Sequence, residues 1–319
     1  MKPDLRALIQ AGLADRYALD RELGRGGMAT VVLARDLQHD RPVAIKVLLA
    51  ELAQTVGADR FKREIRVAAR LQHPNILSVL DSGDIEGQLW FAMPFVEGEN
   101  VYERLQRDGP FAPAEALRIA QAAASALAYA HEQGVVHRDI KPENILLSGD
   151  QVLVADFGVA RAVSEVAEKL TATGMVVGTP TYMSPEQASG EKAIDGRTDT
   201  FALGCVLYEM ISGDAPFKGP TPQATLMRRF MGPPRPLRPM ANISEAVEQA
   251  IMRSLAREPA ERFATAAEFA DALAGKAVPA AAPALATGAD ASTPAKKGCG
   301  AAVLLFIALG GVLGRALLG

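Results

Sequence analysis

The spacing of hydrophobic and polar residues along this chain changes once, near Gly98. Before that point, short apolar runs alternate with clusters of glycine and aspartate, a pattern typical of strands in an antiparallel sheet. Residues 58–72 differ, because their apolar side chains recur at the spacing of an amphipathic helix. The predicted strands cover residues 17–19, 30–34, 43–48, 76–82 and 88–95.

After Gly98 the pattern is helical. Residues 113–133 form a long alanine-rich stretch with almost no β-branched side chains. A small, mainly β region at 17–97 therefore precedes a larger, mainly α region at 98–274, which indicates the α+β class. The remaining predicted helices cover residues 1–16, 197–213, 220–231, 244–256 and 265–274.

The C-terminal residues differ from the rest of the chain. An Ala/Pro-rich stretch at 275–297 predicts a linker, and residues 298–319 contain one charged residue, Arg315. As a helix, this last segment would be about 33 Å long, enough to cross the hydrocarbon core of a bilayer. We expect a single transmembrane helix. The alternative is an apolar helix that packs on the protein or on a partner.

Two features of this tail bear on its orientation and assembly. Lys296 and Lys297 precede the apolar segment, and the positive-inside rule places that flank in the cytoplasm, together with the preceding domain. Gly310 and Gly314 form a Gly-x-x-x-Gly pattern, which lets two helices approach closely and suggests a homodimer. In a glycine-rich tail the same pattern also arises by chance.

Composition narrows the classes of function. The 319 residues are 49% hydrophobic and 22% charged, as in a folded domain with a sizeable core. The formal net charge of -3 argues against non-specific binding of nucleic acid. The two cysteines, Cys205 and Cys299, lie far apart in sequence, so neither a disulfide framework nor a zinc site is expected. The N-terminal residues lack the apolar stretch of a signal peptide.

A glycine-rich turn joins the first two predicted strands. Gly24, Gly26 and Gly27 would let the backbone approach a polyphosphate closely and offer it N–H donors. An ordinary glycine hairpin would contain the same residues, and Ala29 stands where nucleotide-covering loops usually have a third glycine.

A lysine interrupts the apolar strand at 43–48. Burying an unpaired ammonium group is costly, so Lys46 requires an acidic partner if it is buried. Glu64, on the helix predicted at 58–72, is the candidate. The alternative is an edge-strand lysine that points into solvent.

The residue types that phosphoryl transfer requires lie close together in sequence. Asp139, Lys141 and Asn144 belong to the run His-Arg-Asp-Ile-Lys-Pro-Glu-Asn, and Asp156 ends a later apolar run before Phe-Gly. One carboxylate can orient the attacking hydroxyl and accept its proton, while an amide and a second carboxylate can hold magnesium. A cation can offset the charge that develops on the transferred group. The alternative is two polar turns beside buried strands.

In this order, the motifs resemble those of the protein kinase superfamily, specifically bacterial transmembrane serine/threonine kinases of the eukaryotic-like type, over residues 17–274. The resemblance implies a bilobal fold with a small antiparallel β N-lobe and a larger, mainly α C-lobe. It implies ATP and Mg²⁺, or Mn²⁺, with Asp139 as catalytic base and Lys141 on the transferred phosphate. Asn144 and Asp156 are implied as metal ligands. The implied nucleotide-binding residues are Leu23, Gly24, Arg25, Gly26, Gly27, Val31, Ala44, Lys46, Glu64, Met93, Pro94, Val96, Asn144, Leu146 and Asp156.

The run at 91–98 resembles the hinge between the two lobes of a kinase, with Met93 as gatekeeper. The adenine base would then bond to the carbonyl of Pro94 and the N–H of Val96. Proline replaces the usual acidic residue and has no N–H, but only its carbonyl is needed. Binding of adenine is therefore expected to tolerate Pro94.

Further motifs favour serine or threonine over tyrosine as the acceptor. Lys141 and the run at 178–186 both resemble serine/threonine kinases. The resemblance also implies a set of supporting contacts: Glu186 with Arg262, Asp199 with the catalytic loop, and Thr179 near Asp139 and Lys141.

The resemblance also suggests regulation by phosphorylation. Arg138 precedes the expected base, and with Arg161 it would form a basic pocket that a phosphate can neutralise. We expect autophosphorylation at Thr171 or Thr173, in the loop between the two motifs. The alternative is that these threonines are ordinary polar residues on a solvated loop.

The sequence thus predicts a membrane-tethered serine/threonine kinase that acts on protein substrates. One alternative is a catalytically inactive kinase fold that serves as a binding scaffold. The presence of Lys46, Asp139 and Asp156 argues against it. Another is a small-molecule phosphotransferase, which would have little use for a peptide-docking segment such as 178–186.

Overall fold

A computed structural model describes residues 1–279, except 2, 51, 54–56 and 158–179. The chain divides into two compact units, Met1–Ala284 and Leu285–Gly319, and every described helix and strand belongs to the first. Within the described part of the chain, no helix is long and apolar enough to cross a membrane. The predicted transmembrane segment at 298–319 lies outside the described residues.

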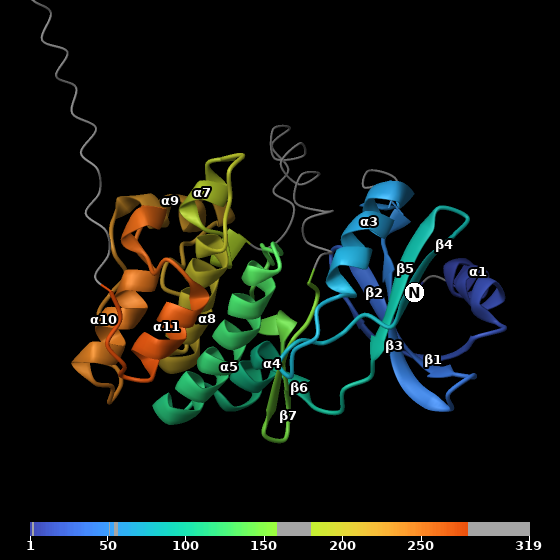
Figure 1. Ribbon diagram of the computed structural model, residues 1–319, viewed down its shortest axis with the longest axis horizontal. Coiled ribbons are helices and arrows are strands. Elements are labelled where there is room, and N and C mark those ends of the chain that lie inside the picture. The colour runs from blue at the N-terminus through green and yellow to red at the C-terminus, as the bar shows by residue number, and fades with distance from the viewer. Residues whose placement is uncertain (2, 51, 54–56, 158–179, 280–319) are drawn as a thin grey trace, which may run out of the picture. The chain divides into compact units, whose positions relative to one another are not determined.

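The N-terminal half is built on one five-stranded antiparallel sheet with the strand order β1-β2-β3-β5-β4 (Figure 1). Apolar residues alternate along β3, so that Val43, Ile45 and Val47 pack against Ile9 and Leu13 of the leading helix α1. The strands are β1 (Tyr17–Arg25), β2 (Ala29–Asp36), β3 (Arg41–Leu48), β4 (Asp81–Ile85) and β5 (Gln88–Pro94), and α1 spans Pro3–Leu13.

The opposite face of the sheet is covered by α3 (Ala58–Ala68), where Phe61 and Ile65 pack with Leu48 of β3. The predicted amphipathic helix at 58–72 is therefore confirmed, although it ends at Ala68. Because side chains alternate along a strand, Ala44 and Lys46 share the α3 face with Leu48. This face carries several of the predicted nucleotide-binding residues.

The predicted strand at 76–82 is wrong in its first part, because β4 begins only at Asp81. Before it, Ile76 forms an isolated parallel bridge with Val154, and the Leu77 N–H donates to the Val154 carbonyl at 2.9 Å. Asn75 accepts a bond from the Val154 N–H at 2.8 Å. Residues 75–77 thus pair with β8, whereas the Leu80 N–H donates to the Ala92 carbonyl of β5 at 2.8 Å.

The second half is mainly helical and includes a small sheet with the strand order β6-β7-β8. The sequence predicted the long helices but not β6 or α4, which the Asn100 side chain caps by accepting from the Glu103 N–H at 2.9 Å. The elements are α4 (Val101–Asp108), α5 (Pro113–Glu132), α7 (Pro185–Ala188), α8 (Arg197–Ser212), α9 (Pro222–Met231), α10 (Glu245–Ser254), α11 (Ala266–Leu273), β6 (Glu99–Asn100), β7 (Ile145–Ser148), β8 (Gln151–Val154), and the 3-10 turns η1 (Pro142–Asn144), η2 (Pro180–Tyr182) and η3 (Pro259–Glu261).

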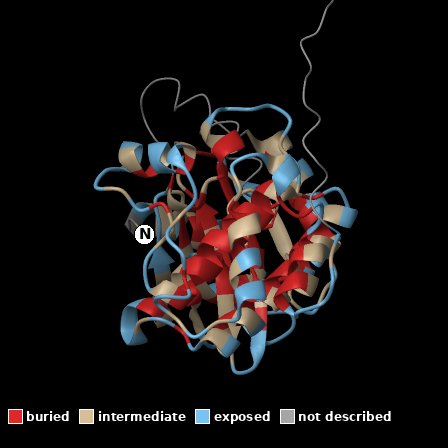
Figure 2. Cartoon of the chain, turned by 90° about the vertical axis from the view of Figure 1, so that its left-hand side faces the viewer, coloured by how far each residue is buried: buried red, intermediate tan, exposed pale blue. Residues whose placement is uncertain are grey.

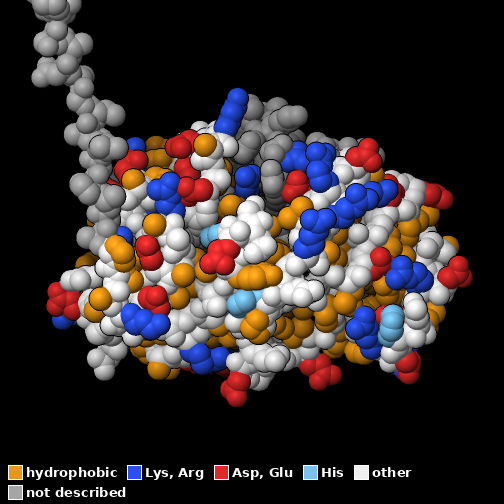
Figure 3. Space-filling view, viewed as in Figure 1, with side chains coloured by type: hydrophobic (Ala, Val, Ile, Leu, Met, Phe, Trp, Pro, Cys, Tyr) orange, Lys and Arg blue, Asp and Glu red, His pale blue; other side chains and the backbone are white. Residues whose placement is uncertain are grey.

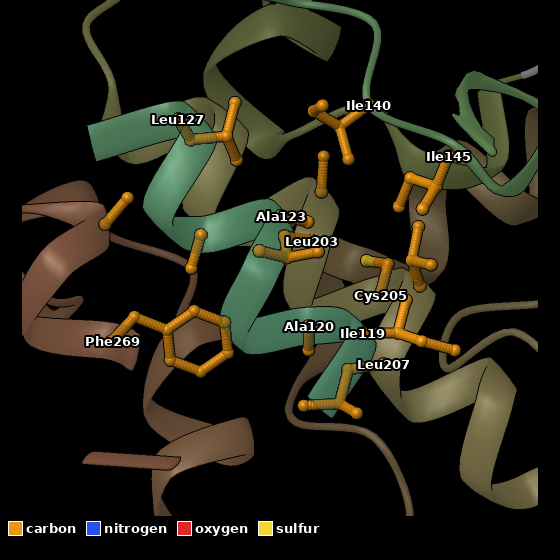
Figure 4. Packing of buried hydrophobic residues seen from close by; sticks show 14 of the residues in the cluster. Ile119, Ala120, Ala123, Leu127, Ile140, Ile145, Leu203, Cys205, Leu207 and Phe269 are labelled. Carbon is orange, nitrogen blue, oxygen red and sulfur yellow. The ribbon is translucent and has the colours of Figure 1, made fainter. Parts of the chain in front are cut away.

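The core of this half centres on α5 and α8. Alanines at the buried face of α5, such as Ala120 and Ala123, let Leu203 and Leu207 of α8 pack closely against it (Figure 4). The same core reaches Ile145 on β7, so the loop before β7 is anchored on it. Buried residues occupy the interior of this half and exposed ones its periphery (Figure 2). On the face shown in Figure 3, acidic and basic side chains are interspersed.

Candidate active site

The strand register brings several predicted nucleotide-binding residues to one face of the N-terminal sheet. Gly24 lies opposite Val31, and Val31 opposite Lys46. Because directly paired residues of antiparallel strands point to the same side, these positions form one row across the sheet. A second row joins Ala44 to Met93. The sequence motifs therefore converge on a single surface.

The turn above this surface leaves open space. It is closed by a bond from the Gly26 N–H to the Ala29 carbonyl at 2.9 Å. A Cβ atom built on Gly24 or Gly27 would meet no heavy atom within 4 Å, and neither residue has a positive φ angle. Backbone conformation therefore does not demand glycine here. The space that side chains would fill fits a phosphate group beside the backbone N–H donors.

Lys46 reaches across to the second half of the domain. Its Nζ forms an ion pair with Oδ2 of Asp156, and both side chains are mostly buried. Burial raises the pKa of the Asp156 carboxyl, but Lys46 outweighs burial and lowers that pKa below its ordinary value. Asp156 also has a φ angle of 70°, an uncommon conformation for a residue other than glycine. The pairing of Lys46 with Glu64 stays a prediction.

The predicted base, Asp139, lies among hydrogen-bond donors. Lys141 donates from Nζ to its Oδ2 at 2.7 Å. Asn144 donates from Nδ2 to the Asp139 carbonyl at 2.8 Å, which leaves the amide oxygen of Asn144 as a ligand. Burial lowers the pKa of the Lys141 ammonium, but Asp139 outweighs burial and raises it. Lys141 therefore stays charged beside the carboxylate at neutral pH.

A buried carboxylate holds the loop that carries this base. Asp199 on α8 is fully buried and accepts from the N–H of His137 at 2.8 Å and from the N–H of Arg138 at 2.7 Å. Arg138 has a φ angle of 68°, and two bonds to one charged acceptor stabilise that conformation. The predicted bracing role of Asp199 is confirmed. His131, which no sequence motif pointed to, also contacts this carboxylate, with its Nε2 2.8 Å from Asp199 Oδ2.

His137 connects the two loops that carry Asp139 and Asp156. Its Nε2 lies 2.8 Å from the carbonyl of Ala155, and its ring packs edge-on against Phe157 with centroids 4.6 Å apart. The Ala155 N–H donates in turn to the Asn144 carbonyl at 2.9 Å. These bonds hold the base, the amide and the second carboxylate in one arrangement.

Comparison with known proteins identifies this arrangement. The protein kinase domain family matches residues 17–273. The chain belongs to this family. Its relatives include the serine/threonine-protein kinase PknB of Mycolicibacterium smegmatis, 43% identical over 264 residues, and PknB of Mycobacterium tuberculosis, 41% identical over 266 residues. Both alignments cover 81% of this chain and 42% of the relative, so the chain spans less than half the length of these curated relatives.

A third relative, the serine/threonine-protein kinase PknJ of Mycobacterium bovis, is 43% identical over 267 residues, which cover 81% of this chain and 45% of PknJ. The fold is similar to that of Rad53 in its crystal structure with AMP-PNP. The TM-score is 0.68 and the sequence identity 25%, over 81% of this chain and 65% of that one. The predicted bilobal fold, with an antiparallel β N-lobe and a helical C-lobe, is confirmed.

The other predicted nucleotide contacts of the kinase domain lie on elements beside these rows. Leu23 lies on β1, just before the glycine turn, and Leu146 on β7 pairs with Leu153 of β8. Arg25 is exposed and bonds Glu22 through its Nε at 3.1 Å. The adenine bonds predicted for Pro94 and Val96 stay predictions.

The kinase domain offers two oxygen donors for magnesium. Among the described residues, no group of three or more His, Cys, Asp or Glu side chains could hold a metal ion. Magnesium bound with a nucleotide needs only one or two protein ligands, because phosphates and waters supply the rest. The free amide oxygen of Asn144 and the carboxylate of Asp156 fit that requirement.

Helix α7, whose start belongs to the run at 178–186, is also anchored. The carboxylate of Glu186, at the start of α7, accepts hydrogen bonds from both terminal nitrogens of Arg262 at 2.7 and 2.8 Å. Both side chains are buried. This predicted pair is confirmed. Gln187 donates from Nε2 to the Arg138 carbonyl at 2.9 Å and so joins α7 to the catalytic loop. Arg161, Thr171, Thr173 and Thr179 lie outside the described residues.

A buried cation that no sequence motif pointed to also contacts this part of the C-lobe. Arg229 of α9 donates from Nη2 to the Pro180 carbonyl at 2.8 Å and is 2% exposed. Burial lowers the pKa of its guanidinium below the ordinary value.

Proposed function

We propose that this chain is an ATP- and magnesium-dependent serine/threonine protein kinase. The observation that carries the proposal is the convergence of two sets of groups: Lys46 with Asp156, and Asp139 with Lys141 and Asn144. Phosphoryl transfer consists mainly of positioning and charge stabilisation, and these are the groups it uses. The printed names of the relatives, serine/threonine-protein kinases, support the same assignment.

The nucleotide would lie on the face of the sheet that carries Val31 and Lys46, under the glycine turn. Because Lys46 and Asp156 are in contact, phosphate oxygens held by the lysine and metal held by the aspartate would be adjacent. Asn144 and Asp156 would hold magnesium, which would supply positive charge to offset that of the phosphates.

Transfer would then depend on the catalytic loop. Asp139 is 37% exposed at its side chain, so an acceptor hydroxyl can reach it from solvent. Its carboxylate would orient the hydroxyl and accept its proton as the oxygen attacks the γ-phosphorus, while the bond from that phosphorus to the β–γ bridging oxygen breaks and ADP leaves. Lys141 offsets the negative charge that develops on the transferred group. Asp199 keeps the loop in this geometry.

A peptide assay tests this function. Full-length protein in mild detergent would be incubated with Mg²⁺, γ-labelled ATP and three peptides that differ only in carrying Ser, Thr or Tyr at one position. We expect label on the Ser and Thr peptides and none on the Tyr peptide. Protein that binds ATP but labels no peptide, and no residue of its own, would favour the scaffold function.

We also propose that residues 298–319 tether the kinase domain to a membrane, with the domain on the cytoplasmic side. The support is the apolar segment itself and the lysine pair before it. The full chain is expected to stay with membranes after alkaline carbonate washing, and a variant lacking 298–319 is not. Release of the full chain by carbonate would contradict a spanning helix.

Autophosphorylation of Thr171 or Thr173 is a further part of the proposal. Its support is Arg138, whose buried Nε has no hydrogen-bond partner in the described part of the chain. That N–H group could donate a hydrogen bond to a phosphate oxygen. Mass spectrometry after incubation with Mg²⁺ and ATP should find phosphate on one of these threonines, and none on Asp139→Asn protein. Active protein with both threonines unmodified would contradict it.

A further inference from the structure

A hollow on the C-lobe lies apart from the residues assigned to catalysis. It has a volume of about 550 Å³. We call it the α9 groove, after the helix whose C-terminal end forms one wall. Its other walls are the end of α8 with Tyr208, the segment at 214–218, and the segment at 232–240. The Tyr208 hydroxyl donates to the Arg235 carbonyl at 3.0 Å, which fixes one wall to another.

The rim of the α9 groove exposes flexible apolar side chains. Met231 is 81% exposed and Met240 is 51% exposed, and both line the groove. Exposed methionines adapt their shape to an apolar partner, because the side chain is unbranched and polarisable. Phe217 and Pro216 continue this apolar lining inward. The groove therefore fits one inserted apolar side chain.

The charge on the rim is positive. Arg228 and Arg235 are exposed, and neither forms an ion pair in the described part of the chain. The remaining charged residues, Lys218 and Asp214, neutralise each other through a contact of 2.6 Å. Two guanidinium groups beside an apolar hollow complement carboxylates that flank an apolar side chain.

The walls of the groove are connected to the substrate side of the active site. Next to Arg228, Arg229 points inward and bonds the Pro180 carbonyl. Next to Tyr208, Glu209 accepts from the Tyr182 hydroxyl at 2.6 Å. The same two helices thus carry the groove and hold η2, which precedes α7. A peptide bound in the groove would therefore rest on the two helices that also hold η2.

We propose that the α9 groove docks an acidic segment of the protein substrate, with one apolar side chain in the hollow and carboxylates on Arg228 and Arg235. The proposal rests on the proposed kinase function for its use, since docking raises the local concentration of the acceptor hydroxyl. A membrane surface is the weaker partner, because a concave hollow suits a protruding side chain better than a flat layer of headgroups.

Binding tests the groove without relying on activity. Fluorescence anisotropy would measure full-length protein against labelled peptides in which glutamates flank a central Leu, Phe or Met. We expect at least one of them to bind, and its lysine-flanked counterpart not to bind. Reversal of either arginine, Arg228→Glu or Arg235→Glu, should weaken binding by roughly tenfold, since an ion pair becomes a repulsion. Met231→Ser should weaken it as well.

Arg238→Glu is the matched control, because Arg238 is exposed on the same segment but does not line the groove. It should leave binding within about twofold. The proposal is wrong if no glutamate-flanked peptide binds. It is also wrong if Arg228→Glu, Arg235→Glu and Arg238→Glu all bind the peptide with equal affinity. Binding to phosphatidylglycerol vesicles that depends on Arg228 and Arg235, without peptide binding, would replace it with a membrane contact.

Kinetics separates this proposal from the kinase function itself. A generic acceptor peptide would be compared with the same peptide joined by a flexible linker to the best-binding acidic segment. Docking predicts a KM about tenfold lower for the linked peptide, an unchanged kcat, and loss of the difference in Arg235→Glu. Equal KM values with active enzyme would overturn docking alone, whereas no transfer to either peptide would overturn the kinase function.

Discussion

Replacing Arg262 with methionine would show how strongly a buried ion pair stabilises the C-lobe. Arg262 has no exposed side-chain surface, and its partner Glu186 has 5%. The arginine also donates to the carbonyls of Ala256 and Arg257, each at 2.8 Å. The variant would leave a carboxylate buried without its cation. We therefore expect the free energy of unfolding to fall by about 3–5 kcal/mol, the usual cost of breaking a buried pair.

Urea unfolding followed by circular dichroism would measure this loss. Arg107→Met is the matched control, because Arg107 is 58% exposed and pairs with Glu99 and Asp108 at the surface. Its cost should be below about 1 kcal/mol. Combining Arg262→Met with Glu186→Leu should recover part of the loss, since no unpaired charge then remains buried.

The loss should also depend on pH. Burial raises the pKa of Glu186, but Arg262 outweighs burial and lowers it. The pair therefore stabilises the native protein above the ordinary pKa of glutamate, and this contribution disappears as pH falls through the lowered value. In Arg262→Met, burial still raises the pKa of Glu186 while the largest opposing cause is gone, so protonation favours the folded variant. Its deficit should be smaller at pH 5 than at pH 7.

Two results would refute this reasoning. One is a loss below about 1 kcal/mol in Arg262→Met, equal to that of the surface control. The other is a double variant whose loss equals the sum of the two single losses, which would mean that the side chains do not interact.

Three further predictions concern the active site. Gly24→Ala should change the free energy of unfolding by no more than about 0.5 kcal/mol, because its Cβ meets nothing, yet raise the KM for ATP; an unchanged KM would contradict the nucleotide position. Lys46→Met should lower kcat by about 10²–10³-fold in a steady-state assay, and near-normal turnover would exclude a role in charge stabilisation. Asp199→Asn should cost about 1.5–3 kcal/mol in thermal unfolding, because the two loop N–H groups lose a charged acceptor; a shift no larger than that of an exposed Asp150→Asn control would contradict the bracing role.

Local patterns in the sequence were enough to predict most of the strands and the long helices, though not β6 or α4, because each motif reports its own conformation. Glycines marked the turn after β1, and the alanine-rich run marked α5. The family motifs also predicted contacts far apart in the chain, such as Glu186 with Arg262. That pair could be predicted only through the resemblance, since nothing local to either residue names the other.

Other contacts were beyond the sequence because they depend on how separate elements meet. Ile76 and Leu77 have strand-like composition, but their backbone groups pair with Val154 of β8 instead of a strand of the N-terminal sheet. Arg229 bonds a backbone carbonyl. Because every residue has such a carbonyl, the sequence does not reveal which residue is the partner. The pair of Lys46 with Asp156 joins residues 110 positions apart that were assigned separate roles.

Transfer of labelled γ-phosphate from ATP by the Asp139→Asn variant, beside Asp150→Asn, tests the catalytic role of Asp139 most directly. Both variants replace one carboxylate with an amide in the same lobe, but only Asp139 bonds Lys141 and Asn144. We predict that Asp150→Asn transfers phosphate to Ser and Thr like the native protein. Asp139→Asn should bind ATP equally well and transfer almost none. Equal transfer by the two variants would contradict the assignment of Asp139 as the base.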